Sequence, residues 1–410
     1  MRRCDDTQIN AQNSKINRVV ERSRGYLRFR TATRGLEIFY FEERPMVSSK
    51  QVGTAAAAEQ LGSMSLGGRD NDTEPTATAK NGTPAKLLCS ACGEKSDTLK
   101  KCTACLCVWY CGKDCQNRHW KEHKNECKPI KKALAKRGGK LDLGTELDVG
   151  PLEKLPRGEE CPICMRVLPI SLGLQAYFTC CGKFICGGCD FQHKIKSREM
   201  NARKDAERAR RKQPPLPFTC AFCREPLSST NEEALARYRK RIELKDPQAL
   251  CNMATHYGHG QLGLPVDEAK CIDLLRQSAG LGYPPALTQL GILHDTGGMG
   301  LEQNTKEALK YYKKAAEGGQ LLSRHNCGCT EDDNGDHVAA MRHFRLSASG
   351  GYRSSMDILI ARYEDGLFRH AGLAATLRAF YLARVEMKSK DRDKFIEHLK
   401  SIGEYKEEND

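Results

Sequence analysis

Paired cysteines and nearby histidines are the residues of this chain whose types and spacing predict chemistry. The 410-residue sequence holds 21 cysteines, most of them between Cys89 and Cys223. We find no secretory signal and no apolar run long enough to cross a bilayer, so we expect an intracellular protein, cytoplasmic or nuclear, that is not secreted. In a reducing compartment, paired cysteines bind metal more often than they form disulfides. The clustering therefore predicts local zinc sites.

The first cysteine cluster reads CSACGEKSDTLKKCTACLCVWYCGKDCQNRHWKEHKNEC. It contains two C-x2-C pairs, one C-x3-C pair and one H-x3-C pair, and the last pair falls on a predicted helix, where both side chains share one face. Eight soft ligands predict two tetrahedral zinc sites. The candidate ligands are Cys89, Cys92, Cys102, Cys105, Cys111, Cys115, His123 and Cys127. Cys107 and His119 are left over.

This stretch resembles the MYND zinc finger over about forty residues, including the Tyr110-Cys111 step and Trp120 before the histidine. The resemblance implies cross-braced ligation and binding of short, proline-containing peptides. Some MYND proteins are lysine methyltransferases with a SET domain, but no N-H-S-C or comparable SET signature occurs here. One zinc would be held by Cys89, Cys92, Cys111 and Cys115, and the other by Cys102, Cys105, His123 and Cys127.

The second cluster reads CPICMRVLPISLGLQAYFTCCGKFICGGC, followed after thirty residues by CAFCREP. Its pairs, and the step from Cys181 to Cys186, resemble the ligand order of RING domains. An all-cysteine RING would hold one zinc with Cys161, Cys164, Cys186 and Cys189, and the other with Cys180, Cys181, Cys220 and Cys223. The two clusters together predict four Zn²⁺ ions per chain.

One position departs from the RING pattern. Lys183 stands where many RING domains have a histidine, and an ammonium group cannot bind zinc. Adjacent Cys180 and Cys181 would complete the second site, or His193 would substitute for one of them. A third interpretation makes one of the two cysteines a buried thiol beside an incomplete site.

Two further residues bear on ubiquitin transfer. By resemblance, Ile163 matches the position of RING ligases that docks a ubiquitin-conjugating enzyme, and Arg224 matches the arginine that contacts both that enzyme and ubiquitin. Ala221 stands where a proline is usual, and the thirty-residue insertion is basic. The features for and against a ligase are therefore mixed.

Helical repeats follow the cysteine clusters. Ala249 aligns with Ala286, and Gly282 with Gly319, each at an offset of 37 residues. A third copy ends in FRLSASGG, where Ala348 lies only 32 residues after Ala316. A period of this size predicts stacked helix pairs, and the motifs resemble Sel-one-like repeats, relatives of tetratricopeptide repeats.

Several residues in the repeats invite other interpretations. We expect the third copy to be degenerate, with HNCGCTEDDNGD in place of a regular helix and loop. His325, Cys327 and Cys329 have poor spacing for zinc, so a metal site there is not favoured. Cys251 and Cys271 fall at helical core spacing and are expected to be packing residues.

The sequence predicts a multidomain protein, with two small zinc-stabilised α+β modules followed by an all-α helical-repeat solenoid and preceded by a disordered N-terminal arm. The expected order is the arm at 1–85, the MYND-type finger at 86–130, a basic linker at 131–157, the RING-like domain with a basic helical insertion at 158–227, the repeats at 231–385 and a charged C-terminal tail at 386–410.

Two functions fit this organisation. The first is a zinc-binding protein–protein interaction adaptor whose partners are proteins or short peptides. The alternative is a RING-type ubiquitin ligase that docks a ubiquitin-conjugating enzyme and recruits substrate through the finger and repeats. The net charge of +14 would attract nucleic acid, but aromatic residues do not interleave with the basic ones, so such a partner is not favoured. No intrinsic catalytic site is expected.

Overall fold

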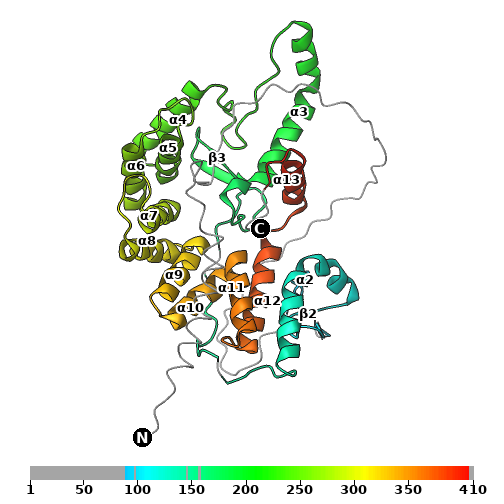
Figure 1. Ribbon diagram of the computed structural model, residues 1–410. Coiled ribbons are helices and arrows are strands. Elements are labelled where there is room, and N and C mark those ends of the chain that lie inside the picture. Colours follow the sequence, from blue (N-terminus) through cyan, green and yellow to red (C-terminus); the bar gives the residue numbers. More distant parts are fainter. Residues whose placement is uncertain (1–87, 97, 145, 156–157, 406–410) are drawn as a thin grey trace, which may run out of the picture.

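The computed structural model describes residues 88–96, 98–144, 146–155 and 158–405. The predicted arm at 1–85 lies outside the described residues. A curved array of helices forms one side of the molecule, and two cysteine-rich modules lie on the other side (Figure 1). None of the helices in the described part of the chain combines the length and apolar character that a bilayer crossing requires.

The first module, here called the finger, pairs two short antiparallel strands and adds one long helix. Strands β1 (Lys100–Lys101) and β2 (Trp109–Tyr110) precede helix α2 (Lys113–Lys136). The buried side chains of α2 recur every three or four residues, which gives the helix one apolar face. Because that face continues through Ile130, Ala133 and Leu134, α2 extends six residues beyond the predicted end of the finger at 130.

The second module, here called the RING-like module, is a hairpin followed by a helix. A 3₁₀ turn, η1 (Leu172–Leu174), leads into β3 (Gln175–Phe178), which pairs antiparallel with β4 (Lys183–Cys186). Helix α3 (Gly187–Arg210) begins within the module and continues through most of the basic insertion. The far end of α3 projects away from the rest of the molecule (Figure 1).

The array begins at α4 (Asn231–Glu243) and stacks helices in sequence order, each in contact with the next. The following helices are α5 (Pro247–His259), α6 (Glu268–Gly280), α7 (Pro284–Thr296), α8 (Thr305–Glu317), α9 (Leu321–Asp333), α10 (His337–Ser349), α11 (Arg353–Glu364) and α12 (His370–Met387). This is a helical solenoid.

Each of the first three repeats is a helix pair, and the second helix of each pair (α6, α8 and α10) begins with the same kind of N-cap. The side chains of Asp267, Asn304 and Asp336 each accept a hydrogen bond from the backbone N–H three residues later. An acidic or amide N-cap satisfies one of the amide donors that a helix start leaves unpaired. The caps recur at the same offsets as the aligned alanines, so they mark the start of each second helix independently of packing.

The third repeat corrects the sequence analysis. The segment HNCGCTEDDNGD, expected in place of a regular helix and loop, contributes its first nine residues to the regular 13-residue helix α9 (Leu321–Asp333). A Cβ at Gly328 would come within 2.6 Å of the Phe344 ring, so the glycine that weakens helix propensity provides the space for an aromatic side chain. The 32-residue offset of the third repeat comes from a shorter loop between its two helices, because α10 starts four residues after α9 ends.

The C-terminal segment also differs from expectation. The predicted tail at 386–410 contains helix α13 (Lys390–Ser401), which packs against α3 (Figure 1). Phe191 on α3 contacts both Phe395 and His398. A Cβ at Gly188 would come within 2.6 Å of the Arg392 backbone, so two glycines at the start of α3 allow the close approach.

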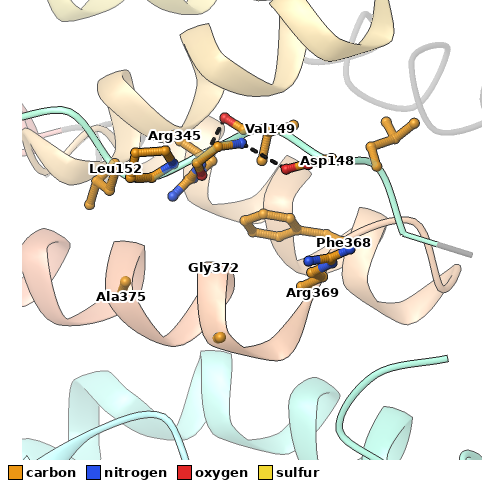
Figure 2. Close-up of a pocket in the computed structure, with 12 residues that line it drawn as sticks. Asp148, Val149, Leu152, Arg345, Phe368, Arg369, Gly372 and Ala375 are labelled. Carbon is orange, nitrogen blue, oxygen red and sulfur yellow. Dashed lines mark hydrogen bonds between the residues drawn. The ribbon is translucent and has the colours of Figure 1, made fainter. Parts of the chain in front are cut away.

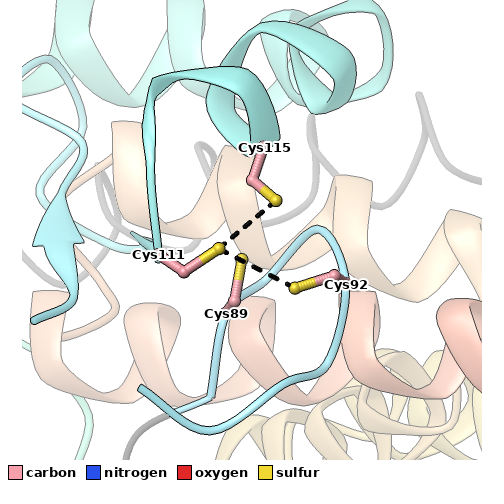
Figure 3. A group of neighbouring side chains, drawn as sticks. All are labelled: Cys89, Cys92, Cys111 and Cys115. Carbon is pink, nitrogen blue, oxygen red and sulfur yellow. Dashed lines mark hydrogen bonds between the residues drawn. The ribbon is translucent and has the colours of Figure 1, made fainter. Parts of the chain in front are cut away.

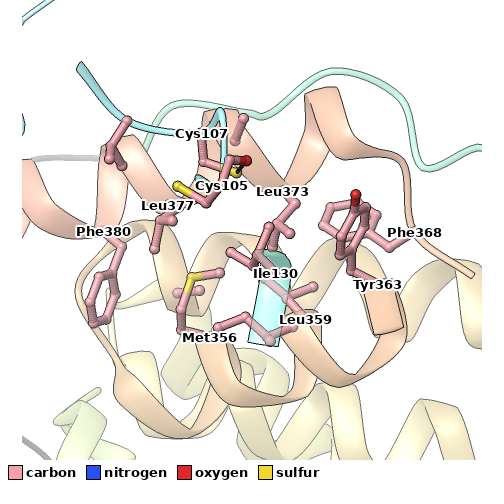
Figure 4. Packing of buried hydrophobic residues seen from close by; sticks show 14 of the residues in the cluster. Cys105, Cys107, Ile130, Met356, Leu359, Tyr363, Phe368, Leu373, Leu377 and Phe380 are labelled. Carbon is pink, nitrogen blue, oxygen red and sulfur yellow. Dashed lines mark hydrogen bonds between the residues drawn. The ribbon is translucent and has the colours of Figure 1, made fainter. Parts of the chain in front are cut away.

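The two modules are built into opposite ends of the array. At the C-terminal end of the array, the finger shares one hydrophobic core with α11 and α12. Ile130 of the finger packs there among Met356, Leu359 and Leu373 (Figure 4). At the N-terminal start of the array, the Tyr177 hydroxyl of the RING-like module donates a 2.7 Å hydrogen bond to buried Asp246. Asp246 also pairs with Arg241.

The segment predicted as a basic linker is also packed in part against the array. Leu147 and Val149 join the core of the finger and the last repeats. The Leu147 N–H donates to the Leu367 carbonyl at 3.0 Å. The chain between the two modules therefore lies along the solenoid over part of its length.

Candidate metal centres

Four groups of side chains bring four metal-ligating atoms within 4.8 Å of one another. We name them finger site 1 (Cys89, Cys92, Cys111, Cys115), finger site 2 (Cys102, Cys105, His123, Cys127), RING-like site 1 (Cys161, Cys164, Cys186, Cys189) and RING-like site 2 (Cys180, Cys181, Cys220, Cys223). These are the groupings that the sequence analysis predicted. Figure 3 shows the four sulfur atoms of finger site 1 converging from a turn, the end of β2 and the first turn of α2.

The distances fit zinc. Zn–S bonds of about 2.3 Å at tetrahedral angles place sulfur atoms about 3.8 Å apart. The Cys92 and Cys111 sulfurs lie 3.9 Å apart, as do those of Cys164 and Cys186. In RING-like site 2, the separation between the Cys181 and Cys220 sulfurs is 3.7 Å. The four clusters are therefore consistent with bound zinc.

Four of the five C-x2-C pairs are held by the same backbone turn, and the fifth, Cys186 and Cys189, lies at the start of α3. The residue four positions after the first cysteine has a positive φ and donates its N–H to that cysteine's carbonyl. Only one of these four residues is a glycine, and the others accept a conformation that costs about 1–2 kcal/mol in an ordinary residue. They are Gly93 (φ 75°), Leu106 (φ 60°), Met165 (φ 53°) and Arg224 (φ 65°). Zinc coordination would offset this strain.

Both modules connect their sites in the same cross-braced order. In each module the first and third ligand pairs along the chain form site 1, while the second and fourth form site 2. Each metal would thus join segments that are separated in sequence, which strongly restricts the unfolded chain. An apparent contribution on the order of 10 kcal/mol per structural zinc explains how modules with such short strands fold.

The adjacent cysteines of RING-like site 2 lie in the tight turn between β3 and β4. The Gly182 N–H donates to the Phe178 carbonyl at 2.7 Å, and this turn allows both the Cys180 and Cys181 sulfurs to face Cys220 and Cys223. His193, the alternative ligand, instead lies with its Nε2 2.9 Å from the Thr219 carbonyl. The geometry thus favours the all-cysteine site.

Lys183 has a different role from the histidine that it replaces. It is exposed at the start of β4, and its ammonium lies 5.0 Å from the centre of the Phe222 ring. This cation–π contact places the lysine beside the C-x2-C turn of RING-like site 2 without entering it.

The histidine of finger site 2 is oriented by the solenoid. His123 Nε2 faces the Cys105 sulfur at 3.5 Å, while Nδ1 lies 3.1 Å from the Tyr381 hydroxyl on α12. Tyr381 donates its proton to Glu126 at 2.5 Å, and Glu126 pairs with Arg353. The hydroxyl must therefore accept from Nδ1–H, which leaves Nε2 deprotonated for a metal. Burial holds the pKa of Tyr381 well above its usual value.

Two arginines donate to the sulfur atoms of the all-cysteine sites. Arg118 Nη2 lies 3.1 Å from the Cys115 sulfur, and Arg392 Nη2 on α13 lies 3.5 Å from that of Cys164. Four thiolates around one Zn²⁺ leave a net negative charge, which a guanidinium stabilises. Arg392 is buried, and its Nη1 donates to the Val167 carbonyl at 2.6 Å, so α13 is fixed directly beside RING-like site 1.

No pattern in the sequence predicted these supporting residues. Tyr381 and Arg392 lie more than 200 residues away in sequence from the groups that they contact. No local motif marks them. Arg118, by contrast, stands three residues after Cys115 on α2, so its place on the helix was a usable signal.

The leftover residues of the finger have structural roles. The buried Cys107 sulfur lies 3.3 Å from the Cys105 carbonyl and 3.4 Å from His370 Nε2 on α12. His119 Nδ1 lies 3.1 Å from the Tyr110 hydroxyl, and burial lowers the pKa of His119 to about 4. Both residues join the interface between the finger and the solenoid.

Cysteines of the repeats lie in the core. Cys251 and Cys271 are buried in one cluster, and burial raises their pKa values to about 12 and about 11. His325 Nε2 contacts the Cys329 sulfur at 3.7 Å, but its Nδ1 faces the Ser355 hydroxyl at 2.8 Å. The ligand groups found among the described residues do not include His325, Cys327 or Cys329.

The two residues expected to contact a ubiquitin-conjugating enzyme are both accessible. The Ile163 side chain is 46% exposed between Cys161 and Cys164. Arg224 is exposed directly after Cys223, and its positive φ makes it the strained residue of that turn. Both residues therefore lie next to metal-site turns that fix their positions.

The chemistry of the four sites follows from their donor sets. Each site presents four soft protein ligands, which fill a tetrahedral zinc ion and leave no position for water. Bound zinc would stabilise the fold without activating a nucleophile. The sites are therefore built for structure and not for hydrolysis.

Metal content tests the sixteen proposed ligands. We expect native mass spectrometry of the full chain to find four zinc ions. Cys180→Ser should reduce the count to three, because it removes one of four donors from RING-like site 2. His193→Ala should retain four. A count of four in Cys180→Ser together with three in His193→Ala would reassign the ligand.

Zinc affinity tests the orienting role of Tyr381. Tyr381→Phe removes the acceptor of the His123 Nδ1–H bond, and we expect about a 10–100-fold weaker affinity at finger site 2. Competition with a chromophoric chelator measures this zinc affinity. Tyr363→Phe is the matched control, since that buried hydroxyl has no hydrogen-bond partner. Equal affinities in wild type and Tyr381→Phe would refute the role.

Comparisons with known families agree with two parts of this description. A model of the MYND finger matches residues 89–127, and a model of the Sel1 repeat matches residues 247–283 and 284–320. Among solved structures, a Sel1 repeat protein from Oxalobacter formigenes is 24% identical, with a TM-score of 0.33, and covers 43% of this chain and 71% of that one.

Curated relatives match short segments. The histone-lysine N-methyltransferase ASHR1 of Arabidopsis thaliana is 44% identical over 57 residues, 14% of this chain and 12% of that protein. Chitin synthase regulatory factor 4 of Schizosaccharomyces pombe is 28% identical over 152 residues, 35% of this chain and 22% of that protein. The chain spans less than a quarter of the length of either relative. The present chain contains a MYND zinc finger and two Sel1 repeats. It also contains a second cysteine-rich module, and the spacing of the cysteines in that module suggests a RING-like fold.

Proposed function

We propose that the protein is a zinc-binding adaptor that holds protein partners together. The observation that carries this proposal is the shared core of the finger and the solenoid, including the hydrogen bond between His123 and Tyr381. A finger joined in this way cannot reorient on a flexible linker. Partners bound to the finger and to the repeats would therefore be held at a fixed distance and angle.

The finger offers a surface for a peptide. Trp120 on α2 is 43% exposed, and its ring centre lies 6.2 Å from that of His123. Trp109 is half-buried on β2, with the Lys101 ammonium 5.4 Å from its ring centre. Tryptophan is enriched among the residues that contribute most to binding at protein interfaces. These side chains support peptide binding at the finger, as its MYND match implies.

The position of the RING-like module supports a second partner. The module is fixed to the start of the array through Tyr177 and Asp246, whereas the finger is fixed to its end. Helix α13 adds a second attachment through Arg392. Two modules held at opposite ends of one rigid array are suited to joining two proteins.

A peptide selection tests the adaptor. We expect the zinc-loaded full chain to select peptides from a random library. By fluorescence anisotropy, Trp120→Ala should weaken their binding at least about tenfold, because truncating a central aromatic contact typically costs about 2 kcal/mol or more. Met200→Ala, an exposed apolar residue on α3, is the control. Binding that survives both Trp120→Ala and zinc removal would exclude the finger as the binding surface.

A RING-type ubiquitin ligase is the second candidate, and the exposure of Ile163 favours it. Ile163 and Arg224 lie at the Cys161–Cys164 and Cys220–Cys223 turns of the RING-like module, where a conjugating enzyme would dock by resemblance. Helix α13 packs against the first turns of α3 but leaves Ile163 accessible. Catalysis would then belong to the docked enzyme.

Self-ubiquitylation with a panel of conjugating enzymes tests this candidate. If the module is a ligase, Ile163→Ala should abolish the activity of the full chain. Arg224→Gly is a cleaner variant than Arg224→Ala, because glycine removes the side chain and also accepts the positive φ at that position. Absence of activity across the panel, with four zinc ions bound, would exclude the ligase.

A further inference from the structure

A cavity of about 340 Å³ lies between the segment 147–152 and helices α10 and α12. Its volume is within the range of small-ligand and peptide-side-chain pockets. Figure 2 shows Leu152 and Arg345 above, Gly372 and Ala375 on α12 below, and the Phe368 ring between these two levels. The lining is mostly apolar, with Leu147, Val149 and Pro151 completing the wall that the segment contributes.

A buried cation lines this cavity. The Arg345 side chain extends from α10, and the residue is only 4% exposed. Its Nη1 donates to the Gly150 carbonyl at 2.7 Å and to the Val149 carbonyl at 3.4 Å (Figure 2). Its Nε is buried without a hydrogen-bond partner. No ion pair among the described residues includes the guanidinium, and the Glu153 carboxylate, outside the lining, acts on it only through its charge.

An unpaired buried cation is unfavourable. Removing a guanidinium from water is strongly unfavourable unless an anion and hydrogen bonds compensate it. The two carbonyls and the Phe368 ring, 5.8 Å from the guanidinium carbon, compensate only in part. The arrangement would be completed by an anionic group entering the cavity.

The other charged groups of the lining agree with an anionic ligand. Arg369 adds an exposed second cation at the start of α12. Asp148 is the one acidic residue in the lining, and its Oδ1 accepts a 3.2 Å hydrogen bond from the Gly150 N–H, within its own segment. The cavity therefore combines an apolar wall with a net positive charge.

We propose that this cavity binds a partner peptide, with a carboxylate beside Arg345 and Arg369 and the neighbouring apolar side chain against Phe368 and Ala375. The inference rests on the proposed adaptor function and assigns a partner chemistry to the solenoid. An acidic residue next to a leucine-like residue matches both the charge and the apolar lining.

Two labelled peptide pools test this assignment on the zinc-loaded full chain. One pool of hexapeptides carries a central Glu-Leu pair, and the matched pool carries Gln-Leu. By fluorescence anisotropy we expect at least about tenfold tighter binding of the Glu-Leu pool, because hydrogen-bonded ion pairs in such sites are worth more than neutral ones. Arg345→Gln should remove the difference between the pools.

Ala375→Leu keeps the test independent of Arg345. Ala375 is only half-buried, so a leucine there should fill the cavity without disturbing the core, and it should weaken both pools at least about tenfold. Zinc content and the far-ultraviolet circular dichroism of each variant confirm folding. Met200→Ala, at an exposed residue outside the cavity lining, should leave the binding of both pools unchanged.

Each other outcome contradicts the proposal. Equal binding of the two pools, or no binding by the wild type, would exclude a carboxylate site. N-acetyl-leucine binding as tightly as the peptides would assign the cavity to small acids. A tenfold gain in peptide affinity on deleting residues 406–410 would make the chain's own KEEND segment the occupant. In all these cases Trp120-dependent binding could remain, so the adaptor function would still stand.

Discussion

The hydrogen bond between His123 Nδ1 and the Tyr381 hydroxyl connects the metal chemistry of this protein to its packing. It fixes the tautomer that finger site 2 requires, and it places α2 against the last helices of the solenoid. Glu126 and Arg353 complete the connection, because each satisfies a polar group that would otherwise be buried alone. The finger is thus one layer of a larger hydrophobic core and not an independent domain.

The RING-like module, at the start of the array, is also connected to the rest of the protein through side chains near its metal sites, but by different residue types. There the contact to a metal site is made by a cation, Arg392, and the attachment to the array is made by Tyr177 through Asp246. The RING-like module has a small core of its own, and its Tyr177 also packs into the hydrophobic cluster at the start of the array. Directional hydrogen bonds and charge therefore act together with shared hydrophobic packing to set the orientation of both modules relative to the solenoid.

The sequence predicted the modules well because their information is local. Ligands two or three residues apart must face one metal, and caps such as Asp267 identify helix starts without reference to the rest of the chain. The α9 helix was missed because its glycine and polar residues weaken local propensity, while burial against Phe344 compensates. Tyr381, Arg392 and the docking of α13 depend on contacts across more than 200 residues, which no local pattern encodes.

The sequence separation of His123 and Tyr381 has a consequence for biosynthesis. During translation the finger emerges from the ribosome 258 residues before the hydroxyl that orients its histidine. Domains usually fold as they emerge, starting from the N-terminal end. Here the first zinc module has all its ligands early, but the hydrogen bond that orients His123 forms only after the last repeat has been made. A nascent chain therefore exposes the apolar face of α2 for most of its synthesis, and the finished array is what ends that exposure.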